Sequence, residues 1–118
     1  MSMSAEAIRH FLHTQVASWN AGDKAGFLAA YRKAAPGGLV IEYVGRPAAD
    51  GWAVLEAMWE RQNAAIEIEE AALIVNGFEA ACHNRNRLKS GARIIDTIEL
   101  YRFEQDGRLL VRYFIRHE

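Results

Sequence analysis

The sequence predicts a single α+β domain in which helices precede an antiparallel meander of strands. Apolar residues recur at helical spacing up to about residue 62. From residue 65 onward the period changes to that of strands, and four long segments follow one another. The segments are separated by the turn-forming pairs Asn76-Gly77, Ser90-Gly91 and Asp106-Gly107. We therefore expect one domain over residues 1–118.

Composition excludes several classes of protein. Hydrophobic residues make up 51% of the 118 residues and charged residues 25%, as is typical of a soluble globular protein. The net charge of -1 gives no electrostatic reason to bind nucleic acid or a membrane surface. No apolar run reaches membrane-spanning length, the N-terminus lacks a signal-peptide pattern, and Cys82 alone excludes an internal disulfide. We expect a cytoplasmic protein.

Three helices are predicted before the meander. The first extends from Ser4, a suitable N-cap, to Asn20, with Gly22 as the stop signal. The second is capped by Asp23 and continues to about Tyr31. The third covers about residues 50–62. The apolar stripes on these helices contain Ile8, Phe11, Leu12, Val16, Trp19, Phe27, Tyr31, Trp52, Leu55, Met58 and Trp59, and Gln15 interrupts the first.

Five strands are predicted. One covers residues 39–44, before the third helix, and the meander consists of residues 66–75, 78–88, 94–103 and 109–117. In strand 94–103 one face carries Glu99 between Thr97 and Tyr101. A carboxyl in apolar surroundings loses hydration, which raises its pKa and lets it donate a proton near neutral pH. Glu99 is therefore the first candidate for a functional acid.

The neighbouring strands predict what faces Glu99. If its face lines a pocket, we expect the last strand to contribute Leu110, Arg112, Phe114 and Arg116, leaving Val111, Tyr113 and Ile115 on the convex face for a dimer interface. Arg112 would then favour a small, oxygenated or acidic ligand. In strand 78–88 either the His83, Arg85 and Arg87 side or the Cys82, Asn84 and Asn86 side lines the pocket. An exposed basic stripe with Cys82 as an inert buried thiol is favoured.

Two short segments carry a resemblance to known proteins. They are Val16-Ala17-Ser18-Trp19-Asn20-Ala21-Gly22-Asp23, before a short helix, and Ile98-Glu99-Leu100-Tyr101-Arg102-Phe103 with Asp106-Gly107-Arg108-Leu109. With this order of elements, the chain resembles the nuclear transport factor 2-like superfamily, and within it ketosteroid isomerase and the SnoaL-like polyketide cyclases. The resemblance implies a cone-shaped, cystatin-like roll. In this roll a strongly curved sheet wraps around helices, leaves one deep apolar pocket, and forms dimers through its convex face.

The resemblance also implies roles for three residues. Glu99 matches the protonated acid of ketosteroid isomerase that donates a hydrogen bond to the substrate oxygen. Gln15 matches its second donor, a tyrosine, and Glu42 matches its general base. The Glu42 match requires about three extra residues in the loop before it, and a shift of one would place Tyr43 there instead. The sequence does not decide which face of strand 39–44 lines the pocket.

The resulting hypothesis is a small-ligand-binding protein that acts by proton transfer as an isomerase, cyclase or hydratase. Glu99, Glu42 and Gln15 are its candidate catalytic residues, and the candidate ligand-binding residues are Arg112, Trp19, Phe27, Tyr31, Trp59, Tyr101 and Phe114. Glu99, Arg112 and Glu42 also share the composition of the acid-arginine-acid relay of related epoxide hydrolases, without its spacing. Motifs for a metal or cofactor are missing, so neither is expected.

The alternatives are structural. Glu99 could instead form an ion pair with Arg112 or Arg116, since buried carboxylates are normally paired. Gln15 could cap a backbone group or lie at the pocket rim, and Glu42 could be a solvated strand residue. The same fold also serves non-catalytic ligand carriers and dimerisation modules, so fold alone does not establish an enzyme.

Overall fold

The computed structural model describes residues 3–91 and 93–116, in which two helices, two strands, a third helix and four strands follow one another. The helices are α1 (Ala5–Asn20), α2 (Lys24–Ala34) and α3 (Gly51–Gln62). The strands are β1 (Gly38–Tyr43), β2 (Ala49–Asp50), β3 (Ile66–Asn76), β4 (Glu79–Leu88), β5 (Ile94–Phe103) and β6 (Arg108–Ile115). Each predicted helix and strand is present. The two-residue β2 was not predicted, and α2 extends three residues beyond Tyr31.

The predicted N-caps Ser4 and Asp23 start the first two helices, and Asp50 caps the third. The side chains of Ser4, Asp23 and Asp50 accept hydrogen bonds from the backbone N–H groups three residues ahead, at 3.0, 2.9 and 3.3 Å. Each bond satisfies one of the amides that a helix leaves without a partner in its first turn. The helix starts are therefore encoded locally.

The sheet has the strand order β2-β1-β6-β5-β4-β3. Strands β3 to β6 form the predicted antiparallel meander. The sheet is nevertheless mixed, because β1 pairs with β6 in parallel. A parallel pair requires a long crossover connection, and here the chain from α3 to β5 provides it.

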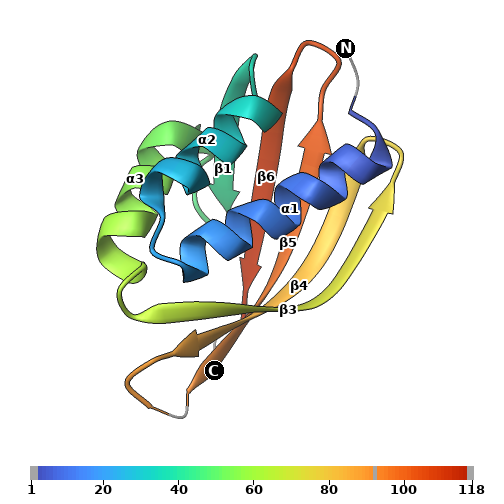
Figure 1. The fold of residues 1–118 in the computed structure, drawn as a ribbon. Helices are drawn as coiled ribbons and strands as arrows, with labels where there is room; N and C mark the ends of the chain where they lie inside the picture. Colours follow the sequence, from blue (N-terminus) through green and yellow to red (C-terminus); the bar gives the residue numbers. More distant parts are fainter. Residues whose placement is uncertain (1–2, 92, 117–118) are drawn as a thin grey trace.

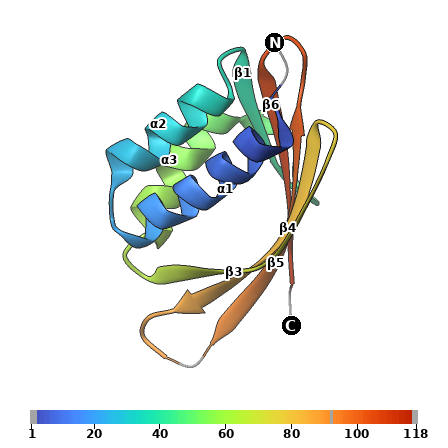
Figure 2. The ribbon, with the colours of Figure 1, turned by 45° about the vertical axis from the view of Figure 1, so that its right-hand side comes forward.

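All three helices lie on one side of a strongly bent sheet, and the other side is bare (Figures 1 and 2). A register shift in β3 between Glu70 and Ala72 is a bulge of the kind that adds bend and twist. The buried core lies between the helices and the concave face of the sheet. Its largest fully buried side chains include Tyr31, Tyr101, Phe27 and Ile8.

The faces of β6 are the reverse of those predicted. Tyr113 pairs with Glu99 and Val111 with Tyr101, so the inward row consists of Leu109, Val111 and Tyr113. Arg112 and Phe114 therefore lie on the convex side. The hairpin loop contains three residues between Glu104 and Arg108, with Gly107 at a φ of 86°. A change of one residue in loop length moves every side chain of a strand to the other face.

Among the described residues, none of the helices is long and apolar enough to cross a membrane.

Candidate functional site

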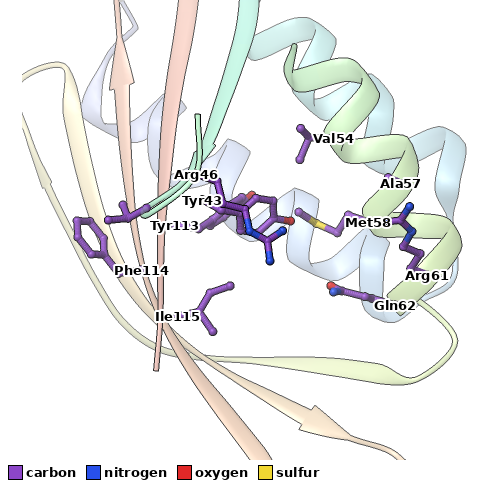
Figure 3. Close-up of a pocket in the computed structure, with 11 residues that line it drawn as sticks. Tyr43, Arg46, Val54, Ala57, Met58, Arg61, Gln62, Tyr113, Phe114 and Ile115 are labelled. Carbon is purple, nitrogen blue, oxygen red and sulfur yellow. The ribbon is translucent and has the colours of Figure 1, made fainter. Parts of the chain in front are cut away.

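A two-part cavity opens between the helices and the concave face of the sheet. The outer chamber, about 450 Å³, lies between the end of β1, the end of β6 and α3 (Figure 3). The inner chamber, about 90 Å³, reaches under α1 to Glu99. Tyr43, Met58, Gln62, Tyr113 and Ile115 line both chambers, so the two chambers adjoin each other. The inner chamber is smaller than a cavity of about 150 Å³ that accommodates benzene.

Glu99 is the one carboxyl group among the residues that line the inner chamber, and its side chain is 7% exposed. Its hydrogen-bond donors are all uncharged. The hydroxyl of Tyr101 donates to Oε1 at 2.6 Å, and the hydroxyl of Thr97 donates to Oε2 at 2.9 Å. The Asn84 amide donates to Oε2 at 3.3 Å, and the Cys82 thiol lies 3.9 Å from Oε1. No arginine pairs with Glu99 in the described part of the chain, so the ion-pair alternative is wrong.

Burial raises the pKa of the Glu99 carboxyl above its ordinary value of 4.5. The hydrogen bonds from Tyr101, Thr97 and Asn84 act in the opposite direction, because they stabilise the carboxylate. Loss of hydration is the larger effect. A group in this setting can hold a proton closer to neutral pH than an exposed glutamate, as acid-base chemistry requires.

Three tyrosines extend the hydrogen-bonded network away from Glu99. The hydroxyl of Tyr31 hydrogen-bonds with the hydroxyls of Tyr101 and Tyr113. Burial and the Glu99 charge raise the pKa of all three phenols. They therefore remain protonated and act as hydrogen-bond donors. Burial likewise raises the pKa of the Cys82 thiol, which agrees with the expected inert cysteine.

Gln15 lies in the first helical stripe and lines the inner chamber. Its side chain is only 5% exposed, yet no hydrogen bond joins its amide to any other residue in 3–91 or 93–116. Among the described residues every fully buried side-chain polar atom has a hydrogen-bond partner, so the unpartnered amide of Gln15 must reach open cavity space. The Gln15 amide is thus available to a bound molecule.

The end of α1 is hydrogen-bonded to the first residues of β3 beside the inner chamber. The Trp19 indole donates to the carbonyl of Ile66 at 2.9 Å. The Asn20 side chain donates to the Ile68 carbonyl and accepts from the Ile68 amide, both at 2.8 Å. Asn63 at the end of α3 donates to the Trp19 carbonyl at 2.8 Å. These bonds give the Trp19-Asn20 segment a structural role in shaping the site.

Two residues expected in the pocket lie on the convex face instead. Glu42 points away from the helices and accepts a hydrogen bond from Arg112 at 3.3 Å. Phe114 lies beside Arg112, with the guanidinium 5.2 Å from its ring centre, but it is also among the residues that line the outer chamber, as predicted for a pocket residue. Tyr43, the alternative to Glu42, lines both chambers. The structure therefore does not bring Glu42 or Arg112 together with Glu99.

The predicted aromatic residues divide into two groups. Trp19, Phe27 and Tyr31 line the inner chamber. Trp59 and Tyr101 do not line the inner chamber but contact residues that do, namely Trp19 and Glu99 respectively. Of the two faces left open for β4, the one with Cys82 and Asn84 faces inward, while His83 on the other bonds to Asp96 at 2.7 Å.

Several lining residues were not predicted as part of the site. They are Tyr113, Thr97, Met58, Gln62, Ile66, Ile68 and Ile115 of the inner chamber, and Arg46 and Arg61 of the outer one. Tyr113 had a usable signal, because the row from Leu109 to Ile115 is wholly apolar or aromatic, whereas the alternate row carries two arginines. In residues 3–91 and 93–116, no three His, Cys, Asp or Glu side chains are grouped to hold a metal ion.

A bent mixed sheet with three helices packed on its concave face and a cavity between them is the nuclear transport factor 2-like fold. Solved structures confirm this class. Over 96% of this chain and 85% of the other, it superimposes on a nuclear transport factor 2-like protein of unknown function from Burkholderia xenovorans LB400, with a TM-score of 0.74 and 13% identity.

Two further structures bear names that suggest an activity. One is a proposed ketosteroid isomerase from Kribbella flavida DSM 17836, with a TM-score of 0.75 and 16% identity over 96% of this chain and 80% of the other. The second is a proposed isomerase of the SnoaL-like family from Agrobacterium tumefaciens str. C58, with a TM-score of 0.73 and 14% identity over 95% and 99%. No protein-family model and no curated protein matches the sequence. At these identities the likeness establishes the fold alone.

Proposed function

We propose that this protein binds a compact organic ligand in the two-chamber cavity and that Glu99 exchanges a proton with it. The observation that carries the proposal is a buried carboxyl, supported only by uncharged donors, at the closed end of an accessible cavity. The unpaired amide of Gln15 lies in the same chamber and would donate to a ligand oxygen. The names of the isomerase-like neighbours agree with this chemistry.

Proton transfer by this site would rely on Glu99 alone. An isomerase with separate acid and base needs two groups within reach of the ligand. Glu42 lies on the other side of the sheet, so it does not supply the second group. Glu99 would have to take a proton from one ligand atom and return it to another, while Gln15 and Asn84 stabilise charge on the ligand oxygen.

A ligand screen with matched variants tests the proposal. The purified protein is screened by thermal shift against phenols, enones, small keto acids, epoxides and steroids at two pH values. Binding to the folded state at a hundredfold excess over Kd stabilises it by about 2.7 kcal/mol. We expect Glu99→Gln to weaken binding about tenfold or more, because a carboxyl that hydrogen-bonds to the ligand is lost. The control is Glu42→Gln, which alters a glutamate on the convex face and should leave binding unchanged.

Catalysis is tested separately from binding. A bound ketone or enone is incubated with the protein in D₂O, and loss of its α-proton signal is followed by NMR. General acid-base catalysis contributes about 10²–10⁴-fold, so Glu99→Gln should abolish most of the exchange. Exchange without any effect of the substitution would contradict the role of Glu99. Binding without exchange would favour the second candidate, a ligand carrier, which the absence of a second carboxyl in the inner chamber supports.

We also propose that the convex face forms a homodimer. Ile98 and Phe114 are paired across β5 and β6, and their side chains are 45% and 37% exposed. Val40, Leu100 and Leu110 lie on the same face, so an apolar surface remains without a covering helix (Figure 2). Glu42, Arg102 and Arg112 lie beside these side chains on the same face, and exposed apolar surface rimmed by polar residues is typical of an interface. It replaces the surface of Val111, Tyr113 and Ile115 expected from the sequence.

The dimer is tested by one charge substitution. Ile98→Asp should convert a dimer to a monomer in sedimentation or light-scattering measurements, because a carboxylate would be buried without a partner. Ala29→Asp on the exposed side of α2 is the matched control and should leave the mass unchanged. A wild-type monomer at high protein concentration would contradict the proposal.

A further inference from the structure

The charges of the outer chamber all have one sign. Its lining contains Arg46 and Arg61 and, among the described residues, no aspartate or glutamate. Arg46 follows β1 and Arg61 lies in the last turn of α3, so the two approach from opposite walls (Figure 3). Burial and the Glu99 charge raise the pKa of the Tyr43 phenol, and the charges of Arg46 and Arg61 both act against that rise, so both guanidinium groups are felt at Tyr43.

Neither guanidinium is neutralised by the described part of the protein. Six other arginines form ion pairs with carboxylates, namely Arg85, Arg87, Arg102, Arg108, Arg112 and Arg116. No such pair joins Arg46 or Arg61 to a residue within 3–91 or 93–116. Arginine presents several donors in a planar fork that matches a carboxylate or phosphate group.

The inner chamber, in contrast, favours an uncharged group over an anion. Glu99 there would repel an anion whenever it is ionised, and its neighbours Gln15 and Asn84 are uncharged amides. Between the two ends the walls consist of Met58, Tyr43, Tyr113 and Ile115, together with the uncharged amide of Gln62. The cavity thus distinguishes the two ends of a ligand by charge.

We infer that the ligand is an organic anion that binds in one orientation. Its carboxylate or phosphate group lies between Arg46 and Arg61, its apolar body lies against Met58 and the tyrosines, and an uncharged oxygen reaches Glu99 and Gln15. The inference rests on the proposed function and adds the ligand class to it. It also restores the expectation of an acidic ligand, with these two arginines in place of Arg112.

Matched acids and neutral compounds test the inference. The probes are 4-hydroxyphenylacetate, 3-(4-hydroxyphenyl)propanoate and phenyl phosphate, with the two primary amides and phenol as neutral counterparts. Calorimetric titration of the wild-type protein should give affinities about tenfold or more higher for the acids, since charge-assisted hydrogen bonds are roughly twice as strong as neutral ones. The carboxylate and phosphate probes distinguish the two possible anionic groups.

The variants assign the effect to the two arginines. The double substitution Arg46→Gln and Arg61→Gln should remove the preference for acids and leave the affinity for amides unchanged. Arg9→Gln, an exposed arginine on α1 that lines neither chamber, is the matched control. Both pocket arginines are exposed, so each single variant should keep the wild-type melting temperature and lose part of the preference.

The outcomes separate this inference from the proposed function. Equal affinity for acids and amides, with both weakened by Glu99→Gln, would overturn the anion preference and leave the ligand pocket standing. A preference that survives the double substitution would overturn the role of the arginines. Failure of every acid and every neutral probe to bind at about 1 mM would overturn both.

Discussion

The stability of the wild-type protein relative to Glu99→Gln should fall as the pH rises from about 4.5. Burial raises the pKa of Glu99 in the folded state, whereas in the unfolded chain it returns to its ordinary value of 4.5. Between these two values the folded protein holds a proton that the unfolded chain releases. The stabilisation is therefore complete below 4.5 and is lost as the pH rises through the folded pKa, at up to about 1.4 kcal/mol per pH unit.

Urea denaturation from pH 4 to 8, at fixed ionic strength and protein concentration, measures this effect. The free energy of unfolding of Glu99→Gln is subtracted from that of the wild type at each pH, which removes the contribution of titrating groups common to both proteins. A difference that declines across the window and then becomes constant supports a raised pKa. A difference independent of pH would mean that Glu99 titrates like an exposed glutamate and that the proposed acid chemistry is wrong.

The elements of the fold could be predicted because each has a local cause. Ser4, Asp23 and Asp50 cap their helices within three residues, and Gly77 and Gly107 adopt the positive φ that their turns require. These interactions are encoded in short segments. The parallel pairing of β1 with β6 joins residues about 70 positions apart, and no local pattern specifies it.

The face of the sheet on which each strand side chain lies was harder to predict than the strands themselves. Glu99 could be identified from its place in an otherwise apolar row, and its burial agrees with that interpretation. The faces of its partner strand were predicted the wrong way round, because the three-residue loop sets the opposite register. Because of this error, Arg112 was predicted to line the pocket in place of Tyr113. Weighing the composition of the two rows against each other would have corrected it.

The two arginines that line the outer chamber could not be inferred from the sequence. Arg46 lies in a loop after β1, and Arg61 lies on α3, 15 residues later. Exposed arginines at such positions are common and usually have no specific role. Only the packing of α3 beside the end of β1 places both at one opening.

Truncation of Phe27 should have the largest effect on folding. Its ring is 1% exposed and contacts Trp19, Tyr31 and Trp59 with centroid separations of 5.5, 5.2 and 5.3 Å. Phe27→Ala would remove a fully buried ring from this cluster and leave a cavity that rigid neighbours cannot fill. We expect a loss of about 3–5 kcal/mol in the free energy of unfolding, measured by urea denaturation.

Phe78→Ala is the matched control, because that ring is 44% exposed in the turn between β3 and β4. It should change stability by about 0.5 kcal/mol or less. Since Phe27 also lines the inner chamber, Phe27→Leu would enlarge the chamber at a smaller cost and should admit bulkier ligands beside Glu99. If Phe27→Ala and Phe78→Ala lowered the free energy of unfolding equally, the cluster of Phe27 with Trp19, Tyr31 and Trp59 would not support the site.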